Sequence, residues 1–560
     1  MIVLRILLIF CGYICASFGA WIAYPKYFLN PYLIFMVFYN QGINSPPIVI
    51  ATSIMGIIIV LMALIPLKKS VKYGIAKFGD LKTAEKADLL GKQGIHFGRI
   101  TKVKNHPDKN KLQLIEEATP TKNIAILDKA FSGLVCAPPG TGKTTTFLIP
   151  TVLLTKNSVI LHDPKGEIYE TTAPFRSTQG KVVKFDPMRE RTSKFNPFCR
   201  EALPEDRRRW RSYIESMALI IIPDDAKGDS FFTANARLLF TFIASYNLAI
   251  DGETSLPDVS STISRNKNLA EAIGEMIDQL DMMEEKDFFI DTAINDGNKV
   301  MNQTISENTW GSITSTIFPK LSIFESPLIK NATEGRNEID MDDFRAGINS
   351  LYMIVREEDK TMLSPLMNIL IQFMAKKLIS EMPEVYEART GKEPNTISFL
   401  LDEFPRLGKM KEMIDFPAIS RGYKVNTFFI AQDFAQLETV YDAKTVASLK
   451  STCAYVLIFQ QNSFEAAENI SKSIGDETET KVSRSTGGGK LYATGSKNLS
   501  EAGKRFITPQ IITDMDFKRA ILLGQGSWTQ PLILETMYWE NEKNLKTLVD
   551  EHKFLRDMIL

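Results

Sequence analysis

One short glycine-rich segment restricts what this chain can fold into more than any other part of the sequence. Residues 137–144 read APPGTGKT and lie between an apolar, strand-like run at 132–137 and a helical pattern. Gly140 and Gly142 allow backbone N–H groups to turn inward around phosphate oxygens without interference from a Cβ atom. The helix that follows presents the positive end of its dipole to the same anion. The segment therefore predicts a phosphate-binding loop on an α/β fold, with alanine at the first position where glycine is commoner.

The loop predicts a site for ATP and Mg²⁺. We expect Lys143 to contact the β- and γ-phosphates and the hydroxyl of Thr144 to bind the metal. The residues expected to hold the nucleotide are Pro139, Gly140, Thr141, Gly142, Lys143, Thr144 and Thr145.

A pair of acids far downstream supplies the carboxylates that such a loop requires. The apolar run at 396–403 ends in Asp402 and Glu403. A buried strand that ends in an acid places the acid beside the metal, so Asp402 is expected to hold Mg²⁺ through water. Glu403 is expected to orient and deprotonate the attacking water, which favours hydrolysis over simple binding.

Other strand ends add polar groups to the same expected site. Apolar runs at 132–137, 158–163, 396–403, 425–432 and 454–459 alternate with helical stretches, which predicts a parallel-rich sheet covered by helices on both faces. Ligands of such sheets lie at the carboxyl ends of the strands.

Three residues at these strand ends have two interpretations each. Gln432 can sense the γ-phosphate or the water, or simply end its strand, and Asp163 can act on the site or belong to a structural turn. Arg421 lies before its strand, at the opposite end of the sheet. It can therefore reach the nucleotide of a neighbouring copy as an arginine finger, or form a surface salt bridge.

The chain divides into four expected parts. Residues 71–200 and 319–560 form the two portions of a nucleotide-binding domain, and the charged, helix-forming segment 201–318 is an inserted all-α domain. The polar, basic, Gly/Ser-rich stretch at 483–505 is expected to be a mobile loop that either contacts a phosphate backbone or is simply solvated.

Residues 1–70 are expected to anchor the chain in a membrane. The uncharged apolar runs at 6–23 and 48–67 have the length that crosses a bilayer as a helix. Lysines directly after the second run place the bulk of the chain on the cytoplasmic side. The alternative for the first run is a cleaved signal peptide.

The balance of 66 basic and 66 acidic residues in the whole chain argues against a uniformly basic nucleic-acid binder.

Several stretches together resemble one family, the TraG/TraD-type coupling proteins of type IV secretion and bacterial conjugation. The stretches are APPGTGKTTTFLIPTVLL (137–154), DPKGEIYETTAPFR (163–176), FDP and FNP (185–187 and 195–197), LLDEFPRLGKM (400–410), SRGYKVNTFFIAQDFAQL (420–437) and RFITPQII (505–512).

The resemblance implies a RecA-like P-loop NTPase in the bacterial inner membrane that assembles as a homo-hexamer. It implies an ATPase site made of Lys143, Asp402, Glu403, Arg421 and Gln432. The implied partners are a relaxase–DNA complex or protein effectors, single- or double-stranded DNA, and inner-membrane components of the secretion channel. Two alternatives stay open, namely an FtsK-like DNA pump and a docking receptor in which ATP is structural.

Overall fold

The structure of the chain is a computed structural model. The structure describes residues 74–559 except 105, 107, 225–229, 267 and 486–495, together with the isolated residues 54 and 58. The chain separates into two compact units, residues 1–72 and 73–560. The elements below belong to the second unit. The predicted spans at 6–23 and 48–67 lie outside the described residues, apart from residues 54 and 58. Within the described part, no single helix is both long and apolar enough to cross a membrane, and one bent pair, Lys360–Leu378 with Pro383–Thr390, passes on length and composition alone.

The second unit is built on one eleven-stranded mixed sheet with the order β2-β1-β13-β12-β9-β3-β8-β7-β4-β6-β5. The seven strands from β9 to β5 are parallel, which confirms the predicted parallel-rich sheet. The other four extend it as antiparallel strands beyond β9, which the sequence did not predict. The strands are β1 (Ile95–Lys102), β2 (Thr119–Leu127), β3 (Gly133–Cys136), β4 (Ser158–Asp163), β5 (Val182–Phe185), β6 (Ser350–Ile354), β7 (Ile397–Leu401), β8 (Val425–Ala431), β9 (Tyr455–Ile458), β12 (Arg519–Gly524) and β13 (Leu532–Glu535).

Both faces of the parallel strands are buried, which explains why these strands are continuous apolar runs. Successive side chains of a strand point to opposite faces. In β4, accordingly, Val159 and Leu161 belong to one apolar core and Ile160 to the other. β8 divides in the same way, with Phe428 on the first side and Phe429 on the second. A parallel sheet therefore needs a helical layer on each side.

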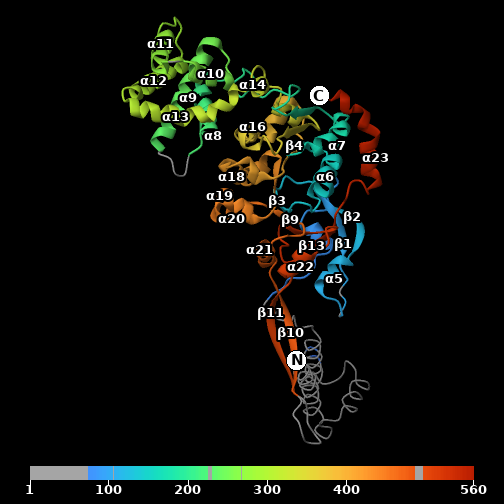
Figure 1. Ribbon diagram of the computed structural model, residues 1–560. Coiled ribbons are helices and arrows are strands. Elements are labelled where there is room, and N and C mark those ends of the chain that lie inside the picture. The colour runs from blue at the N-terminus through green and yellow to red at the C-terminus, as the bar shows by residue number, and fades with distance from the viewer. Residues whose placement is uncertain are drawn as a thin grey trace, which may run out of the picture. The chain divides into compact units, whose positions relative to one another are not determined.

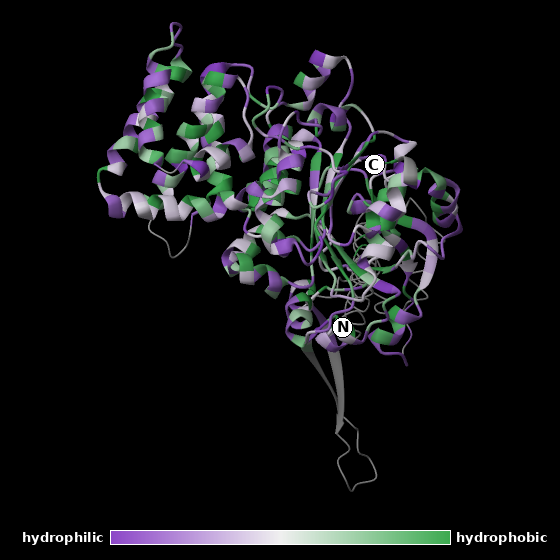
Figure 2. Cartoon of the chain, turned by 45° about the horizontal axis from the view of Figure 1, so that its top comes forward, coloured by the Kyte–Doolittle hydropathy of each residue, from purple (hydrophilic) through white to green (hydrophobic). Residues whose placement is uncertain are grey.

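Two sets of helices provide these layers (Figure 1). On one side, α7 packs against α6 and α23, and apolar side chains of these helices join the first core. On the other side, α16 packs against α18, and α18 against α20. Figure 2 shows the resulting pattern, with apolar residues along the central strands and hydrophilic residues on outer turns. The helices are α6 (Ile149–Leu154), α7 (Glu167–Ser177), α16 (Lys360–Leu378), α17 (Pro383–Thr390), α18 (Lys411–Ser420), α19 (Phe434–Tyr441), α20 (Ala443–Thr452) and α23 (Lys543–His552), and, elsewhere in the unit, α4 (Leu81–Lys86), α5 (Lys111–Glu116), α21 (Phe464–Ile474) and α22 (Pro509–Asp514).

The described residues between β5 and β6 form helices and no strand. The long helix α9 packs against α8, α12 and α13, and α8 in turn packs against α16. Polar caps separate these helices: the Ser255 side chain accepts the backbone N–H of Asp258, and that of Ser306 accepts the N–H of Thr309. The predicted boundary at 318 falls inside α13. The helices are α8 (Trp210–Ile221), α9 (Ser230–Asp251), α10 (Leu256–Arg265), α11 (Leu269–Asp281), α12 (Phe288–Thr304), α13 (Glu307–Leu321), α14 (Pro327–Thr333) and α15 (Met341–Ala346).

The expectation of a mobile loop at 483–505 is wrong for its described residues. β10 (Asp476–Ser485) and β11 (Ser496–Arg505) pair as an antiparallel ribbon in continuous register from Asp476 opposite Arg505 to Ser485 opposite Ser496. The Gly/Ser content suggested a loop, but the alternating Thr478, Thr480 and Val482 have the period of two that a strand requires.

A buried arginine joins two neighbouring parallel strands, β4 and β6, at their amino ends. Arg176 of α7 donates to the hydroxyl of Ser350 at 2.7 Å and to the backbone carbonyls of Thr155, Asn157 and Asn349 at 3.0, 3.0 and 3.2 Å. These carbonyls belong to the segments that lead into β4 and β6. The guanidinium thus donates four hydrogen bonds to neutral oxygens. Among the described residues it has no carboxylate partner.

We expect Arg176→Ala to lower the free energy of unfolding by about 3–5 kcal/mol, because it empties a buried site and leaves the carbonyls of Thr155 and Asn157 without this donor. The stability of Arg176→Lys should lie between that of the wild type and that of Arg176→Ala, since an ammonium cannot reach all four acceptors. Urea unfolding followed by circular dichroism measures the difference. An alanine variant within about 1 kcal/mol of the wild type would show that water replaces the guanidinium.

Candidate nucleotide site

Strand order brings the predicted site residues to one edge of the sheet. β3, β8, β7 and β4 are neighbours in this order, and all four run parallel. Their carboxyl ends therefore lie side by side. The phosphate-loop segment follows β3, Gln432 follows β8, Asp402 and Glu403 follow β7, and Asp163 ends β4. Four segments that are far apart in sequence thus supply polar groups to one place.

The loop after β3 has the backbone form that its glycines predict. Gly140 and Gly142 have φ angles of 83° and 80°, in the left-handed region that a Cβ atom disfavours. The hydroxyls of Thr145 and Thr146 donate to the carbonyl of Gly142 at 3.1 and 2.8 Å. Thr144 starts the helical turn Thr144–Leu148, and its hydroxyl makes no hydrogen bond to a described residue. Thr144 is therefore the threonine with a hydroxyl available to a ligand.

Lys143 contacts both acids that follow β7. Its Nζ lies 2.8 Å from Oδ1 of Asp402 and 3.6 Å from Oε1 of Glu403. All three side chains are largely buried, with 13%, 7% and 15% of their surface exposed. Opposite charges at this depth interact much more strongly than in water. The structure thus brings together the loop lysine and the acid pair that the sequence singled out separately.

The backbone turns sharply at the second acid. Glu403 has a φ of 51°, which is unfavourable for a side chain of this size, and its N–H donates to Oδ1 of Asp402 at 2.9 Å. Such strain in a non-glycine residue is typical of functional sites. The turn directs the two carboxylates differently although they are adjacent in sequence.

Two residues that the sequence did not single out hold this acid pair. Arg406 Nε forms an ion pair of 2.8 Å with Oε2 of Glu403, and the ring of His162 hydrogen-bonds through Nδ1 to the carbonyl of Asp402. Burial lowers the pKa of His162, so the ring is neutral. The arginine three residues after the acid, in DEFPR, was the available signal for Arg406. His162 had none, because its contact depends on the pairing of β4 with β7.

Asp163 is buried beside the pair. Its Oδ2 accepts the backbone N–H of Tyr169 at 2.8 Å, so it caps the start of α7. Burial, with a further contribution from the charge of Asp402, raises the pKa of Asp163 to about 7. Asp163 therefore has both the structural role and the proximity to the site that the sequence left open.

The raised pKa of Asp163 predicts a pH-dependent stability. Between its unfolded pKa of 3.8 and its folded value of about 7, the carboxyl is protonated when folded and ionised when unfolded. Unfolding then releases a proton, so this contribution to stability is present at acidic pH and is lost as the pH rises toward 7. We expect Asp163→Asn to gain stability relative to the wild type across this window, by at most about 4 kcal/mol. Urea unfolding without nucleotide or Mg²⁺ measures it, and a difference that stays constant with pH would refute the assignment.

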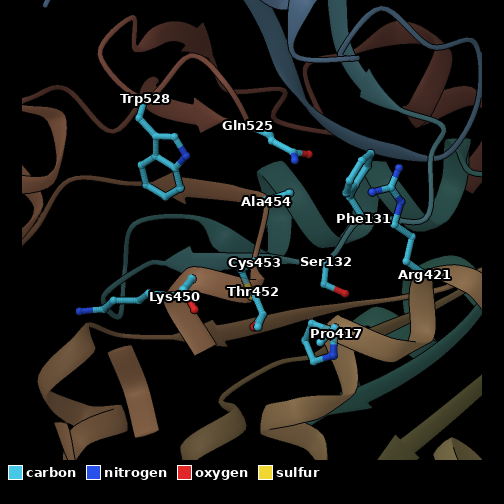
Figure 3. Close-up of a pocket in the computed structure, with 12 residues that line it drawn as sticks. Phe131, Ser132, Pro417, Arg421, Lys450, Thr452, Cys453, Ala454, Gln525 and Trp528 are labelled. Atoms are coloured by element: carbon cyan, nitrogen blue, oxygen red, sulfur yellow. The ribbon is translucent and has the colours of Figure 1, made fainter. Parts of the chain in front are cut away.

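Arg421 lies at the opposite edge of the sheet from Lys143, where β8 begins. Its guanidinium carbon lies 3.8 Å from the ring centroid of Phe131 (Figure 3). It lines a pocket of about 410 Å³ together with Ser132 and Lys450. No carboxylate among the described residues pairs with it, so the salt-bridge alternative is not supported. The structure brings Lys143, Asp402 and Glu403 together and keeps Arg421 apart from them.

The donor set fits a nucleotide with Mg²⁺. Lys143 and the N–H groups of a loop with two left-handed glycines suit phosphate oxygens. The hydroxyl of Thr144 and the carboxylate of Asp402 are the hard oxygen ligands that Mg²⁺ prefers. The loop, the acid pair and the sheet define a RecA-like P-loop NTPase fold.

The sequence model of the family described as "Type IV secretory system Conjugative DNA transfer" matches residues 77–558. The chain belongs to this family, which confirms the resemblance drawn from its motifs.

Curated relatives agree with this assignment. The chain is 28% identical to Protein VirD4 of Rhizobium radiobacter over 425 residues, 74% of this chain and 58% of the relative. It is 27% identical to the conjugal transfer protein TraG of Escherichia coli over 394 residues, 67% of this chain and 60% of the relative. The chain thus spans about three fifths of the length of these relatives.

Solved structures share the fold. The bacterial conjugative coupling protein TrwBdeltaN70 superposes with a TM-score of 0.57 at 15% identity, over 84% of this chain and 94% of its own. Plasmid coupling protein TrwB in complex with ADP and Mg²⁺ gives 0.53 at 16% identity, over 81% and 96%.

Proposed function

We propose that this chain is an ATP-hydrolysing coupling protein that delivers a relaxase–DNA complex, protein effectors or both to a type IV secretion channel. The observation that carries the proposal is the contact of the Lys143 ammonium with both Asp402 and Glu403 at the carboxyl edge of the sheet. A loop lysine next to two carboxylates is an arrangement for cleaving a phosphoanhydride, not only for binding one. The relatives named for conjugal transfer and the TrwB complex with ADP and Mg²⁺ support it.

Each residue has a separate task in this proposal. Lys143 and the loop N–H groups bind the phosphates, while Thr144 and Asp402 would hold Mg²⁺, which neutralises phosphate charge when bound. Glu403 orients the attacking water and accepts its proton. Arg406 holds the Glu403 carboxylate through the 2.8 Å ion pair. Gln432, at the end of the strand between β3 and β7, senses the γ-phosphate or the water.

The site is completed by a second copy of the chain. Arg421 lies at the far edge of the sheet from Lys143 and has no acidic partner among the described residues. In a ring of copies, one subunit presents Arg421 to the nucleotide that its neighbour holds, where the guanidinium stabilises transition-state charge. We therefore propose a closed ring of head-to-tail contacts, which gives every site the same neighbour. Six copies, a homo-hexamer, is the number that the resemblance to the coupling proteins implies.

The remaining features of the proposal concern location and cargo. The two apolar runs at 6–23 and 48–67 anchor the chain in the bacterial inner membrane, with its bulk in the cytoplasm. There it meets the inner-membrane components of the channel. DNA, single- or double-stranded, and protein effectors are the cargo classes.

A transfer assay with Glu403→Gln tests the proposal. In a donor cell that lacks the native gene, the variant should accumulate in the membrane at the wild-type level and lower the transfer frequency by at least about 100-fold, as loss of a general base does. Transfer at the wild-type frequency would instead support the docking receptor in which ATP is structural. Loss of chromosome segregation with unchanged transfer would support the FtsK-like pump.

A further inference from the structure

A basic cleft lies at the carboxyl ends of β5 and β6, on the same edge of the sheet as the candidate nucleotide site. Two adjoining pockets of about 390 and 560 Å³ share Lys184, Asp186, Arg191 and Arg356 as lining residues. β4 separates β6 from β7 in the sheet, so the cleft is next to the acid pair. The DPKGE motif contributes Lys165 and Gly166 to its lining, and the FDP motif contributes Asp186. The proposed ATPase mechanism gives no role to the cations of this cleft.

The cleft carries more positive than negative charge. Asp186 is buried and pairs with Arg356 at 3.3 Å and with Lys184 at 4.0 Å. Arg556 is paired with Glu170. The lining comprises six cations, Lys165, Lys184, Arg189, Arg191, Arg356 and Arg556, and three acids, Glu170, Asp186 and Glu190.

Three of the cations have no acidic partner in the described part of the chain. They are Lys165 in the turn after β4, and Arg189 and Arg191 in the loop after β5. All three are exposed, and they come from two different segments that border one cleft. Arg356 and Lys184, which line both pockets, are paired with the buried Asp186. The cleft therefore combines two cations held by a buried carboxylate with three exposed cations that are free to pair with a ligand, which suits a polyanion better than a single anion.

We propose that this basic cleft binds the phosphodiester backbone of single-stranded DNA. The proposal rests on the proposed function in DNA transfer, and names where the substrate contacts the chain. A single phosphate needs one or two of the cations, whereas cations spread over two adjoining pockets fit successive phosphates of a strand. Lys165 is two residues from Asp163, so a strand in the cleft lies against the turn that borders the nucleotide site.

Fluorescence anisotropy with a labelled oligo-dT of about 20 nucleotides tests the proposal on the full chain in detergent. Lys165→Gln with Arg191→Gln should weaken binding about tenfold or more near 0.1 M salt, and should reduce the slope of log affinity against log salt by about 1.4, because two backbone contacts are lost. Lys122→Gln with Lys444→Gln is the matched control. It removes two exposed lysines with no ion pair, on β2 and α20, and should leave both quantities nearly unchanged.

Further arms separate charge, folding and ligand. Lys165→Arg with Arg191→Lys keeps both charges and should retain binding. Unchanged thermal unfolding and binding of labelled ATP confirm that the neutral variant is folded. If Lys165→Gln with Arg191→Gln binds the oligonucleotide with the affinity and salt slope of the wild type, the proposal is overturned. A variant that loses inorganic phosphate but keeps oligonucleotide would also overturn it, because the cleft would then hold a small anion. If the wild type fails to hydrolyse ATP, the proposed function fails, but this binding comparison still decides the cleft.

Discussion

Replacing Arg421 by alanine is expected to lower the rate of ATP hydrolysis by about 10³-fold or more, the contribution of an arginine finger to transition-state stabilisation. The protein should fold normally, because Arg421 is exposed and its described contact is the ring of Phe131. Such a cation–π contact contributes about 0.5–1 kcal/mol. The nucleotide should still bind, because Lys143 and its loop are at the other edge of the sheet.

A steady-state phosphate-release assay on the assembled protein measures this loss. Arg421→Lys should recover only a small part of the activity, since an ammonium lacks the planar fork of donors that a guanidinium presents to phosphate. Affinity for a labelled ATP analogue serves as the control for folding. Turnover of Arg421→Ala within about twofold of the wild type would remove this residue from the mechanism.

Replacing Glu403 by glutamine is expected to lower hydrolysis by about 10²- to 10⁴-fold while ATP remains bound, because an amide cannot accept the proton of the attacking water. The glutamine keeps the size of the side chain and can adopt the same turn. It loses the ion pair with Arg406, so the side chain also becomes less firmly oriented.

The assay is a single-turnover measurement of radiolabelled ATP, in parallel with its equilibrium binding. Arg406→Ala separates the loss of the base from the loss of its orientation. It keeps the Glu403 carboxylate but removes the ion pair, so the rate of hydrolysis should fall less than in Glu403→Gln. A Glu403→Gln protein that hydrolyses ATP at the wild-type rate would show that another group is the base.

The centre of the sheet and the site were predictable because their signals are local. The apolar runs around Val135, Ile160 and Leu400 are buried on both faces, so a continuous apolar stretch followed by an acid or a glycine turn is enough to indicate a parallel strand and its functional end. The phosphate loop and the acid pair each follow such a strand.

The rest depends on partners that lie far away in sequence. β1 and β13 are about 430 residues apart yet pair side by side. The first half of β2 is mostly exposed and contains no continuous apolar run, as suits an edge strand. The contact of His162 with Asp402, and the left-handed backbone at Glu403, follow from strand register and from a turn that the sequence does not mark. The β10–β11 ribbon was mispredicted as a loop because glycines and serines are frequent in this stretch.

The proposal that two copies of the chain form each site rests on the separation of Arg421 from Lys143 across the sheet. Mixing tests it most directly: Lys143→Ala and Arg421→Ala subunits, each inactive alone, are co-assembled in equal amounts. If the two residues act from different subunits, random mixing pairs an intact Lys143 with a neighbour's intact Arg421 at some interfaces, and about a quarter of the wild-type turnover should return. Mixed assemblies that stay as inactive as either parent would show that Lys143 and Arg421 do not act from different subunits.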